Sequence, residues 1–75
     1  MAKYTIKLTQ NQVADFVHAA EKVDGNVDIF YNNRYIIDAK SILGVLSLDL
    51  TQKLIVETQD RNEYFEKQLQ KYAVA

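Results

Sequence analysis

The chain has 75 residues, of which 48% are hydrophobic, and nine basic against ten acidic residues give a formal net charge of −1. A chain of this length and composition folds as one domain with one small core rather than remaining disordered. The charge balance argues against a protein that binds the phosphate backbone of nucleic acid, because such proteins carry a surplus of basic residues. We therefore expect a single domain over residues 1–75 and no nucleic-acid partner.

The sequence offers little material for a catalytic or metal site. It contains no cysteine, which excludes disulfides and thiolate metal sites, and its single histidine, His18, is too few for a histidine-built metal site. Glu57, Asp60 and Glu63 resemble strand-edge and helix-cap residues rather than a pair of catalytic carboxylates. We expect a protein that is not an enzyme, with no catalytic residue, no metal and no cofactor.

No segment of the sequence predicts an association with a membrane. The longest wholly apolar run with glycine allowed, Ile42 to Leu46, is far too short to span a bilayer. The first nine residues, MAKYTIKLT, lack the apolar core of a secretory signal. The expectation is a cytoplasmic domain with no membrane contact.

The N-terminal part of the chain predicts a strand followed by a helix. Residues Tyr4–Leu8 alternate apolar and polar side chains, which is typical of a strand with one buried face. Thr9 and Gln12 then have the spacing of a capping box, and Asn11 is an alternative cap. A helix to about Val23 is expected next, because apolar residues recur at helical spacing. Its predicted buried stripe consists of Val13, Phe16, Val17 and Ala20.

The middle of the chain predicts a β-hairpin after a turn at Asp24-Gly25-Asn26. Its strands are Val27–Tyr31 and Arg34–Asp38, joined by Asn32 and Asn33. Asparagine tolerates the positive φ that a tight hairpin turn requires, so this pair favours a two-residue connection.

The remaining elements are a short helix after Ser41, a strand over Lys53–Thr58 and a C-terminal helix. Asp60 and Glu63 have the spacing of an acidic capping box for that last helix. Its apolar stripe consists of Phe65, Leu69 and Tyr72. The order β-α-β-β-α-β-α predicts an α+β open-faced β-sandwich, with a mostly antiparallel four-stranded sheet and three helices on one face. Periodicity alone leaves the pairing of the strands open.

The stretch KSILGVLSL, residues 40–48, holds more apolar side chains than one buried helical face can use. With Ser41 at the N-cap and about 100° per residue, Val45 and Leu48 point inward. The outward side chains are then Ile42, Leu43 and Leu46. Exposed contiguous aliphatic side chains on a small protein usually mark a docking surface. The alternative is a helix that lies in a groove and is buried nearly all round.

Ser41 has two roles that are compatible with each other. Serine is a preferred N-cap, and capping alone explains its presence. A hydroxyl at this place is also a good phosphate acceptor, because a phosphate would meet unpaired N–H groups at the helix start. The added negative charge beside the apolar side chains would change the choice of partner. Gly44, two residues into the helix, implies a close approach of the sheet or of a partner, and the sequence does not distinguish the two.

Residues 40–48, the hairpin turn before them and the order of the elements resemble the HPr family. These are the small phosphocarrier proteins of the bacterial sugar phosphotransferase system. The resemblance covers nearly the whole chain and implies the open-faced sandwich already described. It also implies that Ser41 matches a serine that HPr kinase/phosphorylase phosphorylates from ATP, which promotes binding to a catabolite-control transcription factor. By the same resemblance, Ile42, Leu43 and Leu46 match the patch that binds the partner.

The phosphocarrier motif of that family is missing from this chain. The family carries a glycine-apolar-His-Ala-Arg-Pro sequence at the start of the first long helix, whereas this chain reads TQNQVADF between Leu8 and Val17. His18 lies beyond the first helical turn, so we expect a solvated surface histidine. The catabolite-repression HPr homologue, a regulatory variant of the family, likewise lacks the carrier histidine and keeps the serine.

The sequence therefore predicts an HPr-like regulatory adapter with Ser41 as a kinase-controlled switch. Its expected partners are HPr kinase/phosphorylase, a catabolite-control transcription factor or other phosphotransferase-system proteins. Two alternatives stay open. One is a structural module that forms a homodimer through its outward aliphatic side chains, and the other is a phosphocarrier that uses His18.

Overall fold

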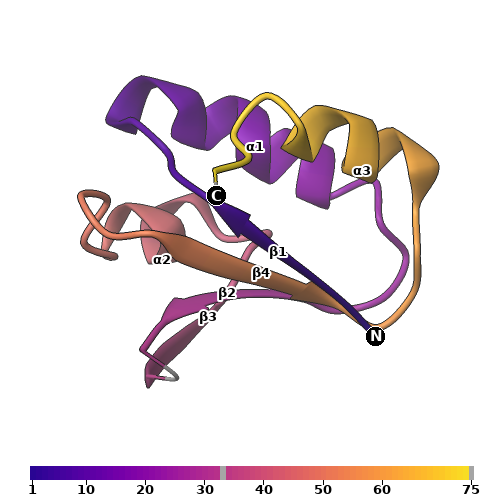
Figure 1. Ribbon diagram of the computed structural model, residues 1–75, viewed down its shortest axis with the longest axis horizontal. Coiled ribbons are helices and arrows are strands. Elements are labelled where there is room, and N and C mark those ends of the chain that lie inside the picture. The colour runs from indigo at the N-terminus through magenta and orange to yellow at the C-terminus, as the bar shows by residue number, and fades with distance from the viewer. Residues whose placement is uncertain (33, 75) are drawn as a thin grey trace.

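In the computed structural model the chain forms a four-stranded antiparallel sheet and three α-helices (Figure 1). The structure describes residues 1–32 and 34–74, except for the side chain of Arg34. The strands lie in the order β1-β4-β2-β3 and span Ala2–Ile6 (β1), Val27–Tyr31 (β2), Arg34–Asp38 (β3) and Leu54–Thr58 (β4). The helices span Val13–Ala20 (α1), Ile42–Leu46 (α2) and Glu63–Leu69 (α3), with a 3₁₀ turn, η1, at Gln10–Gln12. The predicted element order and the antiparallel sheet are confirmed, and the pairing that the sequence left open is now defined.

One apolar layer lies between the sheet and the helices. α1 and α3 run side by side over one face of the sheet (Figure 1), and α2 packs against α1 and β3. The predicted stripes of α1 and α3 are both buried. The Phe16 ring lies 6.1 Å from the ring of Phe65 and 6.2 Å from that of Tyr72, the second contact being edge-on. The sheet contributes the inward side chains Ile6, Val27, Ile29, Leu54 and Val56.

β1 begins and ends earlier than the predicted strand Tyr4–Leu8. Its last pair with β4 joins Ile6 to Leu54. The alternation of buried and exposed side chains continues to Leu8, which is buried, and this continuation misled the prediction. Beyond Ile6 the backbone bonds elsewhere, because the Lys7 N–H donates to the carbonyl of Tyr72 at 3.0 Å.

The C-terminal segment runs along the outer edge of β1. Ile6 forms an antiparallel bridge with Ala73, and the Val74 N–H donates to the carbonyl of Thr5 at 3.1 Å. Figure 1 shows the segment that follows α3 beside β1 accordingly. Within the described residues, β3 is therefore the edge strand with no segment paired along its outer side.

Both long helices have boundaries that differ from the prediction. α1 ends at Ala20 rather than near Val23, because the N–H groups of Lys22 and Val23 donate to carbonyls three residues earlier, as in a tight final turn. At its start, the Thr9 N–H donates to Gln12 Oε1 at 2.9 Å, which is one of the two bonds of the predicted capping box.

The predicted cap of α3 at Asp60 is wrong. Asn62 takes that place, and its Oδ1 accepts the N–H of Phe65 at 2.9 Å. A cap must immediately precede the helix, and a start at Glu63 is what sets Phe65 and Leu69 into the apolar layer.

The hairpin contains a bulge that the sequence did not indicate. Asn32 has φ 56°, as expected for the turn, whereas Asn33 lies outside the described residues. Tyr35 also has a positive φ, 55°. Ile29 pairs with Ile37 and Tyr31 with Arg34, so two residues of β3 lie opposite the single residue Phe30. The bulge brings the Tyr35 ring to 5.7 Å from that of Tyr31.

No helix within residues 1–32 and 34–74 is long and apolar enough to cross a membrane.

We expect that replacing Thr58 by valine stabilises the fold, because the Thr58 hydroxyl is buried without a hydrogen-bond partner among the described residues. Thr58 is 2% exposed, and its Oγ1 has no hydrogen-bond partner among the described residues. An unsatisfied buried polar group costs about 1–3 kcal/mol, so Thr58→Val should raise the free energy of unfolding by about 1 kcal/mol. For a domain of this size that corresponds to a Tm increase of roughly 4–8 °C. Urea and thermal unfolding measure both quantities.

Thr5→Val is the matched control, because Thr5 lies on the other face of the same sheet and is only half-buried. It should change stability by less than about 0.5 kcal/mol. A loss of stability in Thr58→Val would contradict the assignment of an unsatisfied hydroxyl.

Candidate functional site

The short helix α2 has one buried face and one exposed face. Val45 is fully buried and Leu48 is 6% exposed, as predicted for the inward side. The outward prediction is also confirmed, with Ile42 40%, Leu43 82% and Leu46 39% exposed. The alternative in which this helix is buried all round is therefore wrong. We refer to Ile42, Leu43 and Leu46 as the α2 patch.

The close packing of α2 against Ile37 of β3 explains why residue 44 is a glycine. A methyl group built on Gly44 would come within 2.6 Å of Ile37 Cγ2 and 3.1 Å of Ser41 Oγ. Both distances are shorter than ordinary van der Waals contact, so only glycine lets α2 approach β3 this closely. This close approach holds the helix against Ile37 and leaves its opposite face in solvent.

Ser41 caps α2 and is only partly covered. Its Oγ accepts the N–H of Gly44 at 3.1 Å, and its backbone is extended with φ −106° and ψ 111°. At the other end of the helix, Ser47 Oγ donates to the carbonyl of Gly44 at 2.5 Å. The predicted capping role of Ser41 is confirmed by this geometry.

Lys40 holds the connection between β3 and α2, a role that sequence reasoning missed. Its Nζ donates to the carbonyl of Val23 at 2.7 Å, just after α1, and its N–H donates to Asp38 Oδ1 at 2.9 Å. The Ser41 N–H donates to the Asp38 carbonyl at 3.0 Å. The start of α2 is thereby fastened to α1 and β3 at once. Only the tertiary structure brings Val23 within reach of a lysine 17 residues away.

His18 is exposed to solvent, as predicted, and lies in the last turn of α1. The start of that helix holds Gln12, whose Oε1 already accepts a backbone N–H. No free N–H groups of a helix start are directed at a histidine in the last turn.

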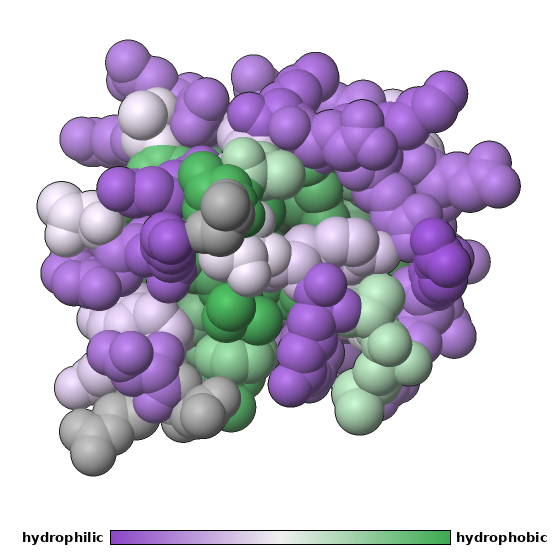
Figure 2. All heavy atoms as spheres, in the orientation of Figure 1, coloured by the Kyte–Doolittle hydropathy of each residue, from purple (hydrophilic) through white to green (hydrophobic). Residues whose placement is uncertain are grey.

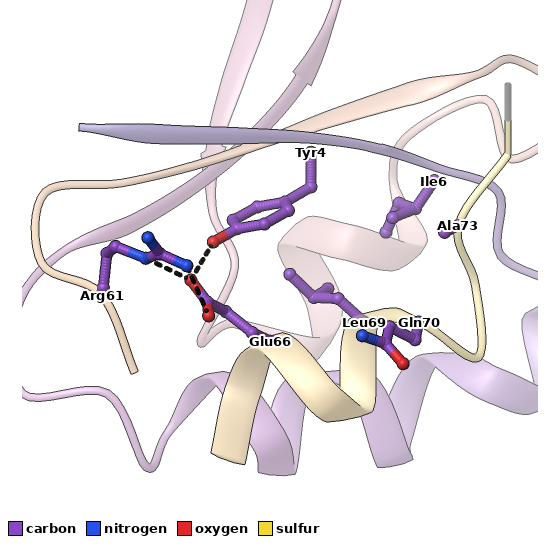
Figure 3. Close-up of a pocket in the computed structure, with 7 residues that line it drawn as sticks. All are labelled: Tyr4, Ile6, Arg61, Glu66, Leu69, Gln70 and Ala73. Atoms are coloured by element: carbon purple, nitrogen blue, oxygen red, sulfur yellow. Dashed lines mark hydrogen bonds and ion pairs between the residues drawn. The ribbon is translucent and has the colours of Figure 1, made fainter. Parts of the chain in front are cut away.

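A pocket of about 280 Å³ lies between β1 and α3 (Figure 3). Its lining residues are Tyr4, Ile6, Arg61, Glu66, Leu69, Gln70 and Ala73. The Tyr4 hydroxyl donates to Glu66 Oε2 at 2.5 Å, and Arg61 donates from Nε to Oε2 at 2.8 Å and from a terminal nitrogen to Oε1 at 3.0 Å. Sequence reasoning missed this cluster, because Tyr4 and Glu66 are 62 positions apart.

Three polar side chains of this pocket, those of Tyr4, Arg61 and Glu66, bond to one another. The hydrogen bonds from Arg61, and then that from Tyr4, lower the pKa of Glu66 from 4.5 to about 2. Burial, followed by the bond to Glu66, raises the pKa of Tyr4, so its hydroxyl stays a donor. We assign the cluster a structural role, in which it fastens α3 to β1. Within the described residues, no group of three or more histidine, cysteine, aspartate or glutamate side chains is placed to hold a metal ion.

Comparisons with protein-family models, with curated proteins and with solved structures find no match to this chain. The resemblance to the HPr family therefore stays a prediction from the sequence of residues 40–48, the hairpin before them and the element order.

Gly44→Ala tests the close approach of α2 to β3. The extra methyl group should displace Ile37 or the helix at a cost of about 1–3 kcal/mol, against a gain of about 1 kcal/mol in helix propensity. We expect a net loss of stability in urea unfolding. Leu43→Ala, at an exposed position of the same helix, should change stability by less than about 0.5 kcal/mol. Equal effects of the two substitutions would contradict the close approach.

Glu66→Gln tests the cluster between β1 and α3. The pKa of Glu66 is lower in the folded than in the unfolded chain, so its stabilising effect is complete above pH 4.5 and is lost as the pH falls toward 2. The stability difference between the natural protein and Glu66→Gln should therefore shrink over this range in urea unfolding at several pH values. Glu63→Gln, which removes an exposed carboxylate in the same helix, is the control. A difference that stays constant with pH would contradict the assignment.

Proposed function

We propose that this chain is a non-enzymatic regulatory adapter of the HPr type that binds a protein partner through the α2 patch. The observation that carries the proposal is the exposure of three aliphatic side chains on one short helix, with Leu43 the most exposed of them. Exposed contiguous aliphatic side chains lose water-accessible apolar area when a partner covers them, and this favours association. The rigid attachment of α2 supports the same conclusion, because a preorganised surface loses little conformational freedom on binding.

The HPr-like form of the open-faced sandwich is part of the proposal. The element order β-α-β-β-α-β-α, the four antiparallel strands and the packing of α1, α2 and α3 around one apolar layer support it. In such a domain, α2 and the serine that caps it are adjacent to each other at the surface.

Ser41 is the proposed switch. An HPr kinase/phosphorylase would transfer the γ-phosphoryl group of ATP to Ser41 Oγ, which loses its proton, and would release ADP. The product carries about two negative charges beside the α2 patch at neutral pH. These charges would weaken the binding of a partner whose contact surface is purely apolar. They would favour the binding of a partner that adds a basic group, such as a catabolite-control transcription factor or another protein of the phosphotransferase system. Phosphate oxygens would still accept the N–H of Gly44, so the domain need not refold.

A phosphocarrier function through His18 is the weaker alternative. His18 is exposed in the last turn of α1, and the stretch TQNQVADF between Leu8 and Val17 lacks the arginine and proline that accompany the carrier histidine in the family. Enzyme I with phosphoenolpyruvate would have to form an acid-labile adduct at His18. A homodimer formed through the α2 patch is the other alternative, since a second copy would cover the same aliphatic side chains.

Phosphorylation is tested with ATP, an HPr kinase/phosphorylase and mass spectrometry of the intact chain and its fragments. We expect one phosphate on Ser41 and none on Ser41→Ala. An HPr known to be a substrate serves as the positive control. If that control is phosphorylated and this chain is not, Ser41 is a helix cap only.

Docking is tested with Leu43→Asp, which should fold normally because this side chain is 82% exposed. Binding to a catabolite-control transcription factor, measured by calorimetry with the phosphorylated protein, should weaken at least about tenfold, which corresponds to about 1.4 kcal/mol. Tyr64→Asp, which introduces the same charge at an exposed position of α3, should leave the Kd unchanged. Unchanged binding of Leu43→Asp to every phosphotransferase-system partner would contradict the patch assignment.

A further inference from the structure

The face of the sheet that the helices leave uncovered, which we call the open face, carries a row of apolar side chains. In an antiparallel sheet, directly paired residues point to the same side, so the pairing defines rows that cross the strands. Ile55 of β4 pairs with Phe30 of β2, and the bulge sets Ile36 of β3 beside Phe30. Ile36 is 62% exposed. Figure 2 shows hydrophobic surface that runs as a band across the sheet, with hydrophilic side chains on both sides.

Phe30 indicates that this apolar row is distinct from the main core. Its side chain is 7% exposed, yet Phe30 does not belong to the cluster of buried side chains beneath the helices. Among its neighbours on the open face, Ile55 is only half-buried and Ile36 is exposed. The row therefore holds one aromatic ring out of water and leaves aliphatic surface beside it uncovered.

The backbone of β3 is strained at the point where it joins this row. Tyr35 has φ 55°, a conformation that bulky side chains rarely adopt. With the same two-residue connection and no bulge, Ile36 would pair with the inward residue Ile29. The bulge therefore moves Ile36 from the core side of the sheet to the open face. A strained residue whose effect is to expose an aliphatic side chain indicates a function for that side chain.

Beside the apolar row, the open face is negatively charged over β2 and β3. Asp28 of β2 pairs directly with Asp38 of β3, and neither carboxylate has an ion-pair partner among the described residues. Glu57, the next residue of the same row, differs because Lys3 forms an ion pair with it at 3.4 Å. Like charges directly opposite each other on neighbouring strands destabilise a sheet. The isolated domain thus carries two uncompensated carboxylates next to exposed aliphatic surface.

The basic side chains of the open face lie away from these two carboxylates. Among the described side chains, alternation along the strands directs those of Lys3, Lys7 and Lys53 to this face. Lys3 lies in β1, Lys7 directly after it and Lys53 directly before β4, whereas β2 and β3 form the other half of the sheet. The charge of the open face over β2 and β3 is therefore negative, and a partner that covers this half must be basic.

We infer that the open face binds an amphipathic helix of a protein partner, with lysine or arginine on one flank of that helix. Its apolar side chains would cover Ile55, Phe30 and Ile36, and its basic side chains would face Asp28 and Asp38. Such a partner removes both unfavourable features of the free domain at once. The exposed aliphatic surface leaves water, and the paired carboxylates gain opposite charges.

The dimensions of the open face fit a helix that lies across the strands. Neighbouring strands are about 4.8 Å apart, so the apolar row spans about 10 Å from β4 to β3. This length corresponds to about two helical turns of about 5.4 Å each. The two carboxylates lie two residues further along their strands, about 6.7 Å from the apolar row. That offset is close to the radius of a helix with its side chains, about 5–6 Å, so flanking basic residues would lie over the carboxylates.

The small size of this contact limits its strength. It covers parts of three strands, which places it at the low end of specific interfaces, where complexes are weak and transient. We expect a Kd between about 10 μM and about 1 mM at low ionic strength. Added salt should weaken the binding, because the charges that attract each other are close to solvent.

An NMR titration of the isotope-labelled protein with a probe peptide tests the inference. The probe is an amphipathic helix of about 18 residues built from leucine and lysine, and its control has glutamate in place of every lysine. The basic peptide should shift the amide signals of β2 and β3, and the acidic peptide should not. Ile36→Ser should weaken the binding at least about tenfold, whereas Leu43→Asp, on the α2 patch, should leave the Kd unchanged. Equal binding of the two peptides overturns the inference, and so does binding that Leu43→Asp abolishes and Ile36→Ser does not.

Neutral variants test the role of the two carboxylates. Asp28→Asn/Asp38→Asn keeps the shape of both side chains and the oxygen that accepts the Lys40 N–H, so the fold should persist. This double variant should weaken binding of the basic peptide at least about tenfold and reduce its dependence on salt. Asp15→Asn/Glu63→Gln removes the same amount of charge from exposed positions of α1 and α3 and should leave the Kd within about twofold.

An equal loss of binding in the two double variants would show attraction to acidic surface in general and would overturn the inference. Self-association of the free protein in sedimentation equilibrium, abolished by Ile36→Ser, would make a second copy the occupant and would overturn it as well. These measurements involve neither phosphorylation of Ser41 nor the α2 patch, so a failure here leaves the adapter proposal standing.

Discussion

The single apolar layer between sheet and helices is the constraint on which the whole structure depends. A chain of 75 residues has too little volume for a second layer, so every element must reach this one. Phe16 lies at its centre, fully buried, with the rings of Phe65 and Tyr72 against it. These contacts join α1 to α3 and to the segment beyond α3, which continues along β1. β1 and the segment beyond α3 are thereby held on the same core.

This constraint explains why one apolar face of α2 stays exposed to solvent. The layer has room for Val45 and Leu48 from this part of the chain, and Gly44 brings their helix as close to Ile37 as a backbone can come. The remaining aliphatic side chains have no buried place left. Lys40 and the cap at Ser41 fix both sides of the helix start, so the α2 patch is held in one orientation rather than being a loose loop. Its exposure is a consequence of packing, and a partner would meet a preformed surface.

Much of this structure could be predicted from local patterns, because period-2 and helical spacing directly reflect which side chains meet the core. The two strands of the hairpin and the inward and outward sides of α2 follow from such patterns. The predicted strand end at Leu8 and the cap at Asp60 were wrong, because a pairing partner and a helix register decide those boundaries. The bond from Lys40 to Val23 and the cluster of Tyr4, Arg61 and Glu66 join positions far apart in the sequence, where no local pattern indicates them.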